Sequence, residues 1–150
     1  MQVRSYPERK WATVTYGKVH SHSDMPGTGA REEGSQSFAF RKLFRYISGA
    51  NESGSAISMT VPVSTRVTEQ AGRTTEEMGF YVPSQHQAAV PAPASESGVA
   101  IVTRPEMVAF VRQFGGFARD GDWTQQRDAL VQELRQREDA DTIDFDCYYR

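Results

Sequence analysis

The sequence lacks the features that mark several large classes of protein. Cys147 is the only cysteine among 150 residues, which excludes an internal disulfide framework and a cysteine-rich metal site. No apolar run approaches the ~18 residues needed to cross a bilayer, so no membrane span is expected. The N-terminus carries no hydrophobic signal region. These absences predict a cytoplasmic protein.

An excess of charge of one sign is also lacking. The 17 Lys and Arg residues nearly balance the 19 Asp and Glu residues, and the formal net charge is −2. Such a balance gives no strong field to attract nucleic acid or an anionic membrane, and we expect no nucleic-acid partner. The sequence also contains no Ser-His-Asp, Cys-His, phosphate-loop or G-x-G-x-x-G pattern, so we expect no enzymatic activity.

The most informative segment is Phe40–Val63, which begins as a helix and ends as a strand. Four of its apolar residues recur at i, i+3, i+4 and i+7 and form one continuous stripe: Phe40, Leu43, Phe44 and Ile47. Arg41, Lys42 and Arg45 lie beside this stripe. A flat apolar ligand with acidic edges would suit such a face, and so would an ordinary protein core.

The remaining pattern predicts an α+β protein. Alternating apolar and β-branched residues predict strands at 3–6, 11–16, 55–67, 78–82, 99–102, 107–113 and 143–149. Helices are expected at 38–48 and 123–137, and the polar composition of 17–37 predicts a flexible loop. The length of the chain fits a single domain, residues 1–150.

The order of these elements repeats along the chain. The first half reads strand, strand, helix, strand, strand, and the second half reads strand, strand, helix, strand and then stops. The last strand is therefore apparently missing, and we expect an open edge on the sheet. Unpaired backbone groups on such an edge invite pairing with another chain, which leaves room for a homodimer or a protein partner.

Several short motifs carry a resemblance to a known family. Y-x-x-G-x-N is followed by M-T-x-P-V, and F-G-G comes later. The stretches that contain or accompany these motifs are Val3–Tyr6, Lys10–Ala12, Leu43–Asn51, Ile57–Val63, Phe80–Pro83, Pro91–Pro93 and Val111–Ala118. Through them the chain resembles the SOUL/heme-binding-protein family over nearly its whole length.

The resemblance implies a fold and a function. Members form a distorted antiparallel β-barrel of two pseudo-symmetric ββαββ halves with two flanking helices. They bind heme and related tetrapyrroles noncovalently, so buffering or transport of heme or another porphyrin is the expected function, with the ligand not required for folding. The ligand is expected in an apolar groove along the first helix. This nominates as lining and propionate partners Phe40, Arg41, Leu43, Phe44, Arg45 and Ile47.

The iron ligand stays open at this point. Ser5 stands where a histidine has been considered an axial ligand in part of the family, so that ligand is absent here. The last family strand, which contains N-E-V-W, is also missing from the sequence. His20 and His22, spaced i, i+2 in the polar loop, are weak metal candidates.

Two other functions stay open. An interaction module would dock a protein partner through the second helix or the open edge strand. A small-molecule-sensing or hydrolase-like domain would use a buried glutamate that faces aromatic side chains, and its candidates are Glu77, Tyr81 and Trp123.

Overall fold

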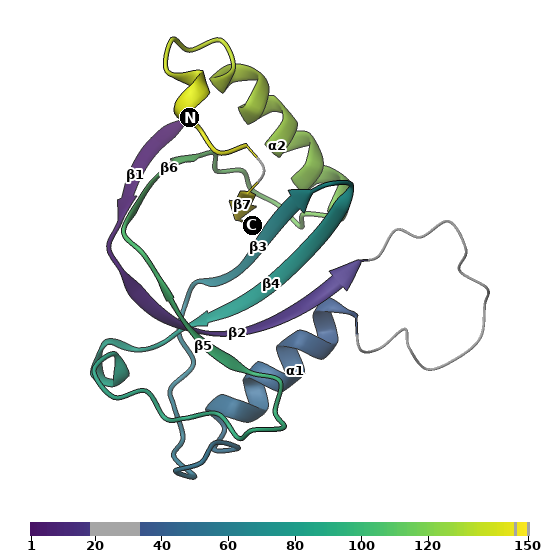
Figure 1. Cartoon of the computed structure of the whole chain (residues 1–150). Coiled ribbons are helices and arrows are strands. Elements are labelled where there is room, and N and C mark those ends of the chain that lie inside the picture. Colours follow the sequence, from purple (N-terminus) through teal and green to yellow (C-terminus); the bar gives the residue numbers. More distant parts are fainter. Residues whose placement is uncertain (19–33, 146, 150) are drawn as a thin grey trace, which may run out of the picture.

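The computed structural model describes residues 1–18, 34–145 and 147–149, which form two α-helices and two antiparallel sheets (Figure 1). In chain order the elements are β1 (Gln2–Tyr6), β2 (Arg9–Lys18), α1 (Gln36–Ile47), β3 (Val63–Gln70), β4 (Arg73–Tyr81), β5 (Ala100–Arg104), β6 (Met107–Val111), α2 (Asp120–Leu134) and β7 (Cys147–Tyr149). The predicted α+β class and the predicted order of elements are confirmed. Most of the loop predicted at 17–37 lies outside the described residues.

Predicted and observed strand boundaries differ most around β3. The strand expected at 55–67 begins only at Val63, because Pro62 has no N–H to give to a ladder. The residues before it run beside α1 instead, where the amide of Ile57 donates to the carbonyl of Ile47 at 2.7 Å. Beyond the predicted ends, β3 and β4 continue as a tight hairpin through Ala71–Gly72, where both residues have positive φ.

The two-stranded ladder continues one edge of the five-stranded sheet in the same strand register. The five-stranded sheet has the order β5-β2-β4-β3-β7, and β1 pairs with β6 in a separate two-stranded ladder. The β1–β6 ladder ends at the pair Tyr6–Met107, and the β2–β5 ladder starts at Arg9–Arg104. Two residues lie between these pairs on each strand, and each side contains a proline, which cannot donate a ladder hydrogen bond. The two ladders are thus one antiparallel ribbon with a short break.

The five-stranded sheet is strongly curled. The guanidinium of Arg104, on edge strand β5, lies 5.2 Å from the ring centroid of Tyr149, on edge strand β7. Side chains of the two edge strands therefore meet across the inside of the curve. The described strands do not show a closed ring of backbone ladders, and the barrel implied by the family resemblance is seen here as this curled sheet.

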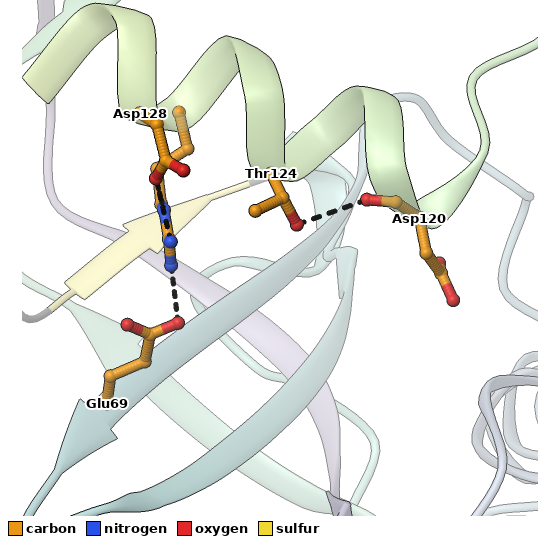
Figure 2. A network of polar contacts seen from close by, with 5 residues as sticks. Glu69, Asp120, Thr124 and Asp128 are labelled. Carbon is orange, nitrogen blue, oxygen red and sulfur yellow. Dashed lines mark hydrogen bonds and ion pairs between the residues drawn. The ribbon is translucent and has the colours of Figure 1, made fainter.

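Helix α2 forms ion pairs with both sheets. Arg127 of α2 pairs with Glu69 at the end of β3, and Figure 2 shows Glu69 pointing up toward the helix. In a second ion pair, Oε2 of Glu133 in α2 lies 3.8 Å from Nη1 of Arg112, which directly follows β6. Ion pairs therefore link α2 to the five-stranded sheet and to the end of the two-stranded ladder.

The hydrophobic core lies between α1 and the outer face of β2 and β4, and Figure 1 shows α1 beside β2. Ser35 caps the helix by accepting a hydrogen bond from the amide of Phe38. The buried members of the core are Ala12, Val14, Tyr16, Ala39, Leu43, Tyr46, Ile47, Ile57, Met78, Phe80 and Val99. One face of the five-stranded sheet is thus apolar and covered, which fixes how α1 is oriented.

Candidate ligand-binding surface on helix α1

The structure divides the apolar stripe of α1 between the core and the surface. Leu43 is fully buried and Ile47 is 7% exposed, whereas Phe40 and Phe44 are 39% and 50% exposed. The buried face of the helix is centred on Ala39 and Leu43, and at about 100° per residue Phe40 and Phe44 fall at its margin. Of the four predicted lining residues, only the two phenylalanines therefore have accessible side chains, and the prediction is wrong for Leu43 and Ile47.

The two exposed phenylalanines form an aromatic ledge. The rings of Phe40 and Phe44 stack with centroids 6.2 Å apart and an interplanar angle of 13°. Phe40 also meets the buried ring of Phe80 edge-on, with centroids 5.3 Å apart. The ledge is thus anchored to β4, and Leu43 and Ile47 support it from the core.

Arg41 and Arg45 stand one step further around the helix and are exposed. Within the described residues neither makes a hydrogen bond or an ion pair, and no acidic residue occurs in α1. Lys42 differs, because its ammonium group lies 4.6 Å from the ring centroid of Phe38. The sequence F-R-K-L-F-R therefore places a column of two phenylalanines beside a column of two arginines whose guanidinium groups are free to bind an acid.

The segment before β3 adds exposed apolar side chains next to this ledge. The register pairs Val63 with Phe80, so both side chains lie on the face that carries α1. The hydroxyl of Thr60 donates to the carbonyl of Tyr81 at 2.5 Å, which fixes the segment against the end of β4. We call the following set the α1 rim surface: Phe40, Arg41, Phe44, Arg45, Met59, Val61 and Val63.

The comparisons with known proteins agree with the resemblance. A family profile described as "SOUL heme-binding protein" matches residues 1–149. The chain belongs to the SOUL heme-binding protein family. It is 34% identical to human Heme-binding protein 2 over an alignment of 151 residues. This alignment covers 99% of this chain and 67% of the relative.

Two mouse proteins show similar relationships. Mouse Heme-binding protein 1 is 33% identical over 127 residues, covering 79% of this chain and 60% of the relative. Mouse Heme-binding protein 2 is 33% identical over 138 residues, covering 90% of this chain and 62% of the relative. The chain thus spans about two thirds of the length of these members of the SOUL family.

The Y-x-x-G-x-N motif that carried the SOUL resemblance forms a hydrogen-bonded turn after α1, and the Pro91–Pro93 stretch is bonded to it. Gly49 takes the positive φ of 107° that ends the helix. The Asn51 amide group donates to the carbonyls of Tyr46 and Ser55 at 3.0 and 2.7 Å. The Tyr46 hydroxyl donates to the carbonyl of Pro91 at 2.6 Å, and burial raises the pKa of this hydroxyl. These residues have a structural role, which is to direct the segment that leads to Met59 and Val61.

The opposite, inner face of the sheet carries a second polar cluster. Arg104 has an exposed side-chain fraction of 8%, and it donates to Ser64 Oγ at 2.7 Å and to Glu77 Oε1 at 3.1 Å. Its Nε is buried and has no hydrogen-bond partner among the described atoms. The charge of Arg104 is thus already neutralised by a partner within the fold.

Aromatic rings complete this inner cluster. The guanidinium of Arg104 lies 4.2 Å from the ring centroid of Trp11 and 5.2 Å from that of Tyr149. A Cβ atom at Gly79 would come within 2.8 Å of Arg104 Nη2 and 3.2 Å of Trp11, so a side chain there would displace the guanidinium group. The cluster is a packed structural unit that ties β5 to β3, β4 and β7.

The remaining predicted site residues are not brought together. Glu77 pairs with Arg104, and Tyr81 meets Trp11 edge-on at 5.6 Å. Trp123 packs instead on Phe114, with centroids 4.8 Å apart. The three candidates for a hydrolase-like site therefore do not form one group.

The described residues contain no candidate metal site and no helix that could span a membrane. His20 and His22 lie outside the described residues. Across residues 1–18, 34–145 and 147–149 no group of three or more His, Cys, Asp or Glu side chains is placed to hold a metal ion. Neither helix in this part of the chain is long and apolar enough to cross a membrane.

Sequence reasoning missed Met59, Val61 and Val63 as surface residues. They lie in the predicted strand 55–67 as well as in a family motif, and Met59 was expected in the core, because an apolar residue in an extended segment is by default expected there. A signal was present in the sequence, since residues 53–68 contain no acidic side chain and Pro62 interrupts the strand pattern.

Proposed function

We propose that this protein binds heme or a related tetrapyrrole reversibly and noncovalently on the ledge formed by Phe40 and Phe44, and that it buffers or carries this ligand without catalysing a reaction. The single observation that carries the proposal is the stacked, half-exposed phenylalanine pair beside two arginines that have no partner among the described residues. This arrangement occurs in a chain that belongs to the SOUL heme-binding protein family.

The chemistry of a porphyrin suits this arrangement. The macrocycle is a flat apolar plate, and covering apolar surface contributes roughly 25 cal/mol per Å². The ring planes of Phe40 and Phe44 are nearly parallel, so a plate can stack on both. The two propionates leave the plate at one edge, where the guanidinium groups of Arg41 and Arg45 can each bind a carboxylate through two hydrogen bonds.

The open character of the ledge supports reversible binding. A plate lying on Phe40 and Phe44 keeps its outer face in water, so only part of its apolar area is removed from solvent. The core beneath the helix is packed without a ligand, since Leu43 and Ile47 already contact the sheet side of the fold. We therefore expect the protein to fold without heme and to bind it with modest affinity.

Iron chemistry at this surface has one candidate among the described side chains. Met59 is 47% exposed and carries a thioether sulfur, a known ligand of heme iron. The single Cys147 does not form the C-x-x-C-H pattern of covalent attachment, which favours noncovalent binding. Binding through stacking and propionate contacts does not require an iron ligand, so iron-free protoporphyrin should bind as well.

Titration with hemin, followed by the Soret band, tests the proposal. We expect a saturable shift, and we expect Phe44→Asp and Arg45→Glu each to weaken binding about tenfold or more, because each removes a contact worth at least ~1.4 kcal/mol. Phe117→Asp is the matched control for the aromatic substitution, because Phe117 is fully exposed in the loop before α2. His86→Ala should also have little effect.

The result that contradicts the proposal is equally specific. An absent or non-saturable Soret change in the unmodified protein would remove the heme function. Equal losses for Phe44→Asp and Phe117→Asp would show that hemin binds nonspecifically to exposed rings, and the ledge would lose its role.

A docking role for α2 is not favoured by the structure. Leu134 is buried and Trp123, Leu130 and Val131 are partly covered, so the apolar residues of this helix are already packed against the rest of the chain. A homodimer through a free strand edge stays a prediction.

A further inference from the structure

The α1 rim surface has apolar side chains that a porphyrin on the phenylalanine ledge does not need. Val61 is 85% exposed, and Met59 and Val63 are 47% and 38% exposed. Val61 lies two residues before the start of β3, in the segment held to Tyr81 through the Thr60 hydroxyl. Apolar side chains are therefore exposed to solvent in and just before the start of β3.

Positive charges predominate in the segments that form this surface, and Glu52, in the turn after α1, is the one acidic residue between Gly34 and Thr68. Residues 34–51 and 53–68 contain no Asp or Glu, although the whole chain has 19 of them. Arg41 and Arg45 point outward without partners in the described part of the chain, and they are the cations closest to the phenylalanines along the helix. The surface thus combines exposed apolar side chains with a positive border, in a protein with a net charge of −2.

This combination is the one that binds the interface of an anionic bilayer. Aromatic and aliphatic side chains enter the boundary between headgroups and acyl chains, and arginines bind the phosphates above it. A folded protein partner would need a complementary apolar face, whereas a lipid surface needs only protruding side chains and positive charge. Val61, the most exposed apolar residue of this surface, lies in a bend before β3 and not on a flat helix face, which favours insertion into lipid.

We propose that the α1 rim surface docks reversibly on anionic phospholipid membranes, with Val61 and Phe44 entering the headgroup region and Arg41 and Arg45 binding lipid phosphates. The attachment lies in the plane of the interface and involves no membrane-spanning segment. Phe44, Arg41 and Arg45 would serve both ligands, so porphyrin and lipid would compete for them, whereas Val61 would contribute to lipid docking alone.

Sedimentation with vesicles tests the proposal. Vesicles of equimolar phosphatidylcholine and phosphatidylserine should carry the protein into the pellet, vesicles of phosphatidylcholine alone should carry much less, and added salt should release it. Val61→Asp should lower the bound fraction about tenfold, because a carboxylate would have to enter the interface beside lipid phosphates. Val108→Asp is the matched control, since Val108 is 67% exposed on β6.

Four outcomes would overturn the proposal. These are no binding by the unmodified protein, equal binding to both vesicle types, equal binding by the unmodified and Val61→Asp proteins, and an equal loss in Val108→Asp. A dimer in gel filtration that Val61→Asp converts to a monomer would assign the surface to a second copy instead. Circular dichroism checks that Val61→Asp remains folded, as expected for so exposed a residue.

The hemin titration separates this inference from the proposed function. Val61→Asp should keep its hemin affinity while losing vesicle binding, whereas Phe44→Asp should lose both. Loss of hemin binding in Val61→Asp would mean that the two surfaces cannot be separated, and the independent membrane role would be wrong.

Discussion

The two faces of the five-stranded sheet use arginine in opposite ways. On the inner face, the guanidinium of Arg104 is enclosed by Trp11 and Tyr149 and bonded to Glu77. On the side that carries α1, Arg45 is exposed and has no partner among the described residues. An arginine whose charge is neutralised inside the fold contributes to the architecture, whereas an unpartnered one remains free to bind an acid. This comparison is our reason for proposing ligand binding on the helix and not inside the curved sheet.

The sharpest test of this comparison lies within α1 itself, where core and surface residues are neighbours. Leu43→Ala should lower the free energy of unfolding by about 2–5 kcal/mol, because it opens a cavity at a fully buried position. Phe44→Ala, one residue later, should cost ~1 kcal/mol or less, since its ring is half exposed. Urea unfolding measures both, and similar losses would mean that Phe44 is a core residue.

The inner cluster should show the next largest effect. Arg104→Ala leaves Glu77 without its partner inside the fold and removes the contact with Trp11. Because Glu77 is 19% exposed and retains some hydration, we expect a loss of about 2–3 kcal/mol and a changed tryptophan fluorescence. Arg45→Ala should change stability by no more than ~0.5 kcal/mol. Equal stability of the two variants would refute the structural role of Arg104.

The smallest effect is expected at Tyr46, and it depends on pH. Burial holds the pKa of its hydroxyl above the ordinary value of 10.0, so the folded state keeps this proton at a pH where the unfolded state has lost it. The stabilising contribution is complete below pH 10 and falls as the pH rises through the folded-state pKa.

Tyr46→Phe isolates this contribution. It should cost about 1 kcal/mol at neutral pH, because the carbonyl of Pro91 loses its donor. The difference in unfolding free energy between the two proteins should then narrow above pH 10. A constant difference across this range would show that the hydroxyl ionises equally in both states.

Much of the fold could be predicted from local sequence patterns. The helical period placed α1 almost correctly, and strand alternation gave the order of the elements. The start of β3 was missed because the apolar residues before Pro62 look like strand residues, although they run beside α1. Local periodicity reports which residues share a face, but pairing across the fold decides where a strand begins.

The candidate site was predicted only in part, for a related reason. The stripe from Phe40 to Ile47 was recognised, but the periodicity does not say how much of it the sheet covers. The covered part of the stripe depends on how α1 packs over Phe80, which only the tertiary structure determines. The Arg104 cluster joins residues from strands β2, β3, β4, β5 and β7, and no short-range pattern connects them.

The short break in the long antiparallel ribbon protects the protein against invasion by a foreign strand. Four residues form the break, Pro7 and Glu8 on one side and Pro105 and Glu106 on the other, and the prolines carry no amide hydrogen. A passing β-strand would find few donors there, and the two glutamates would repel any acidic segment that approached. The gap in the backbone ladder is thus a poor template for pairing with another strand.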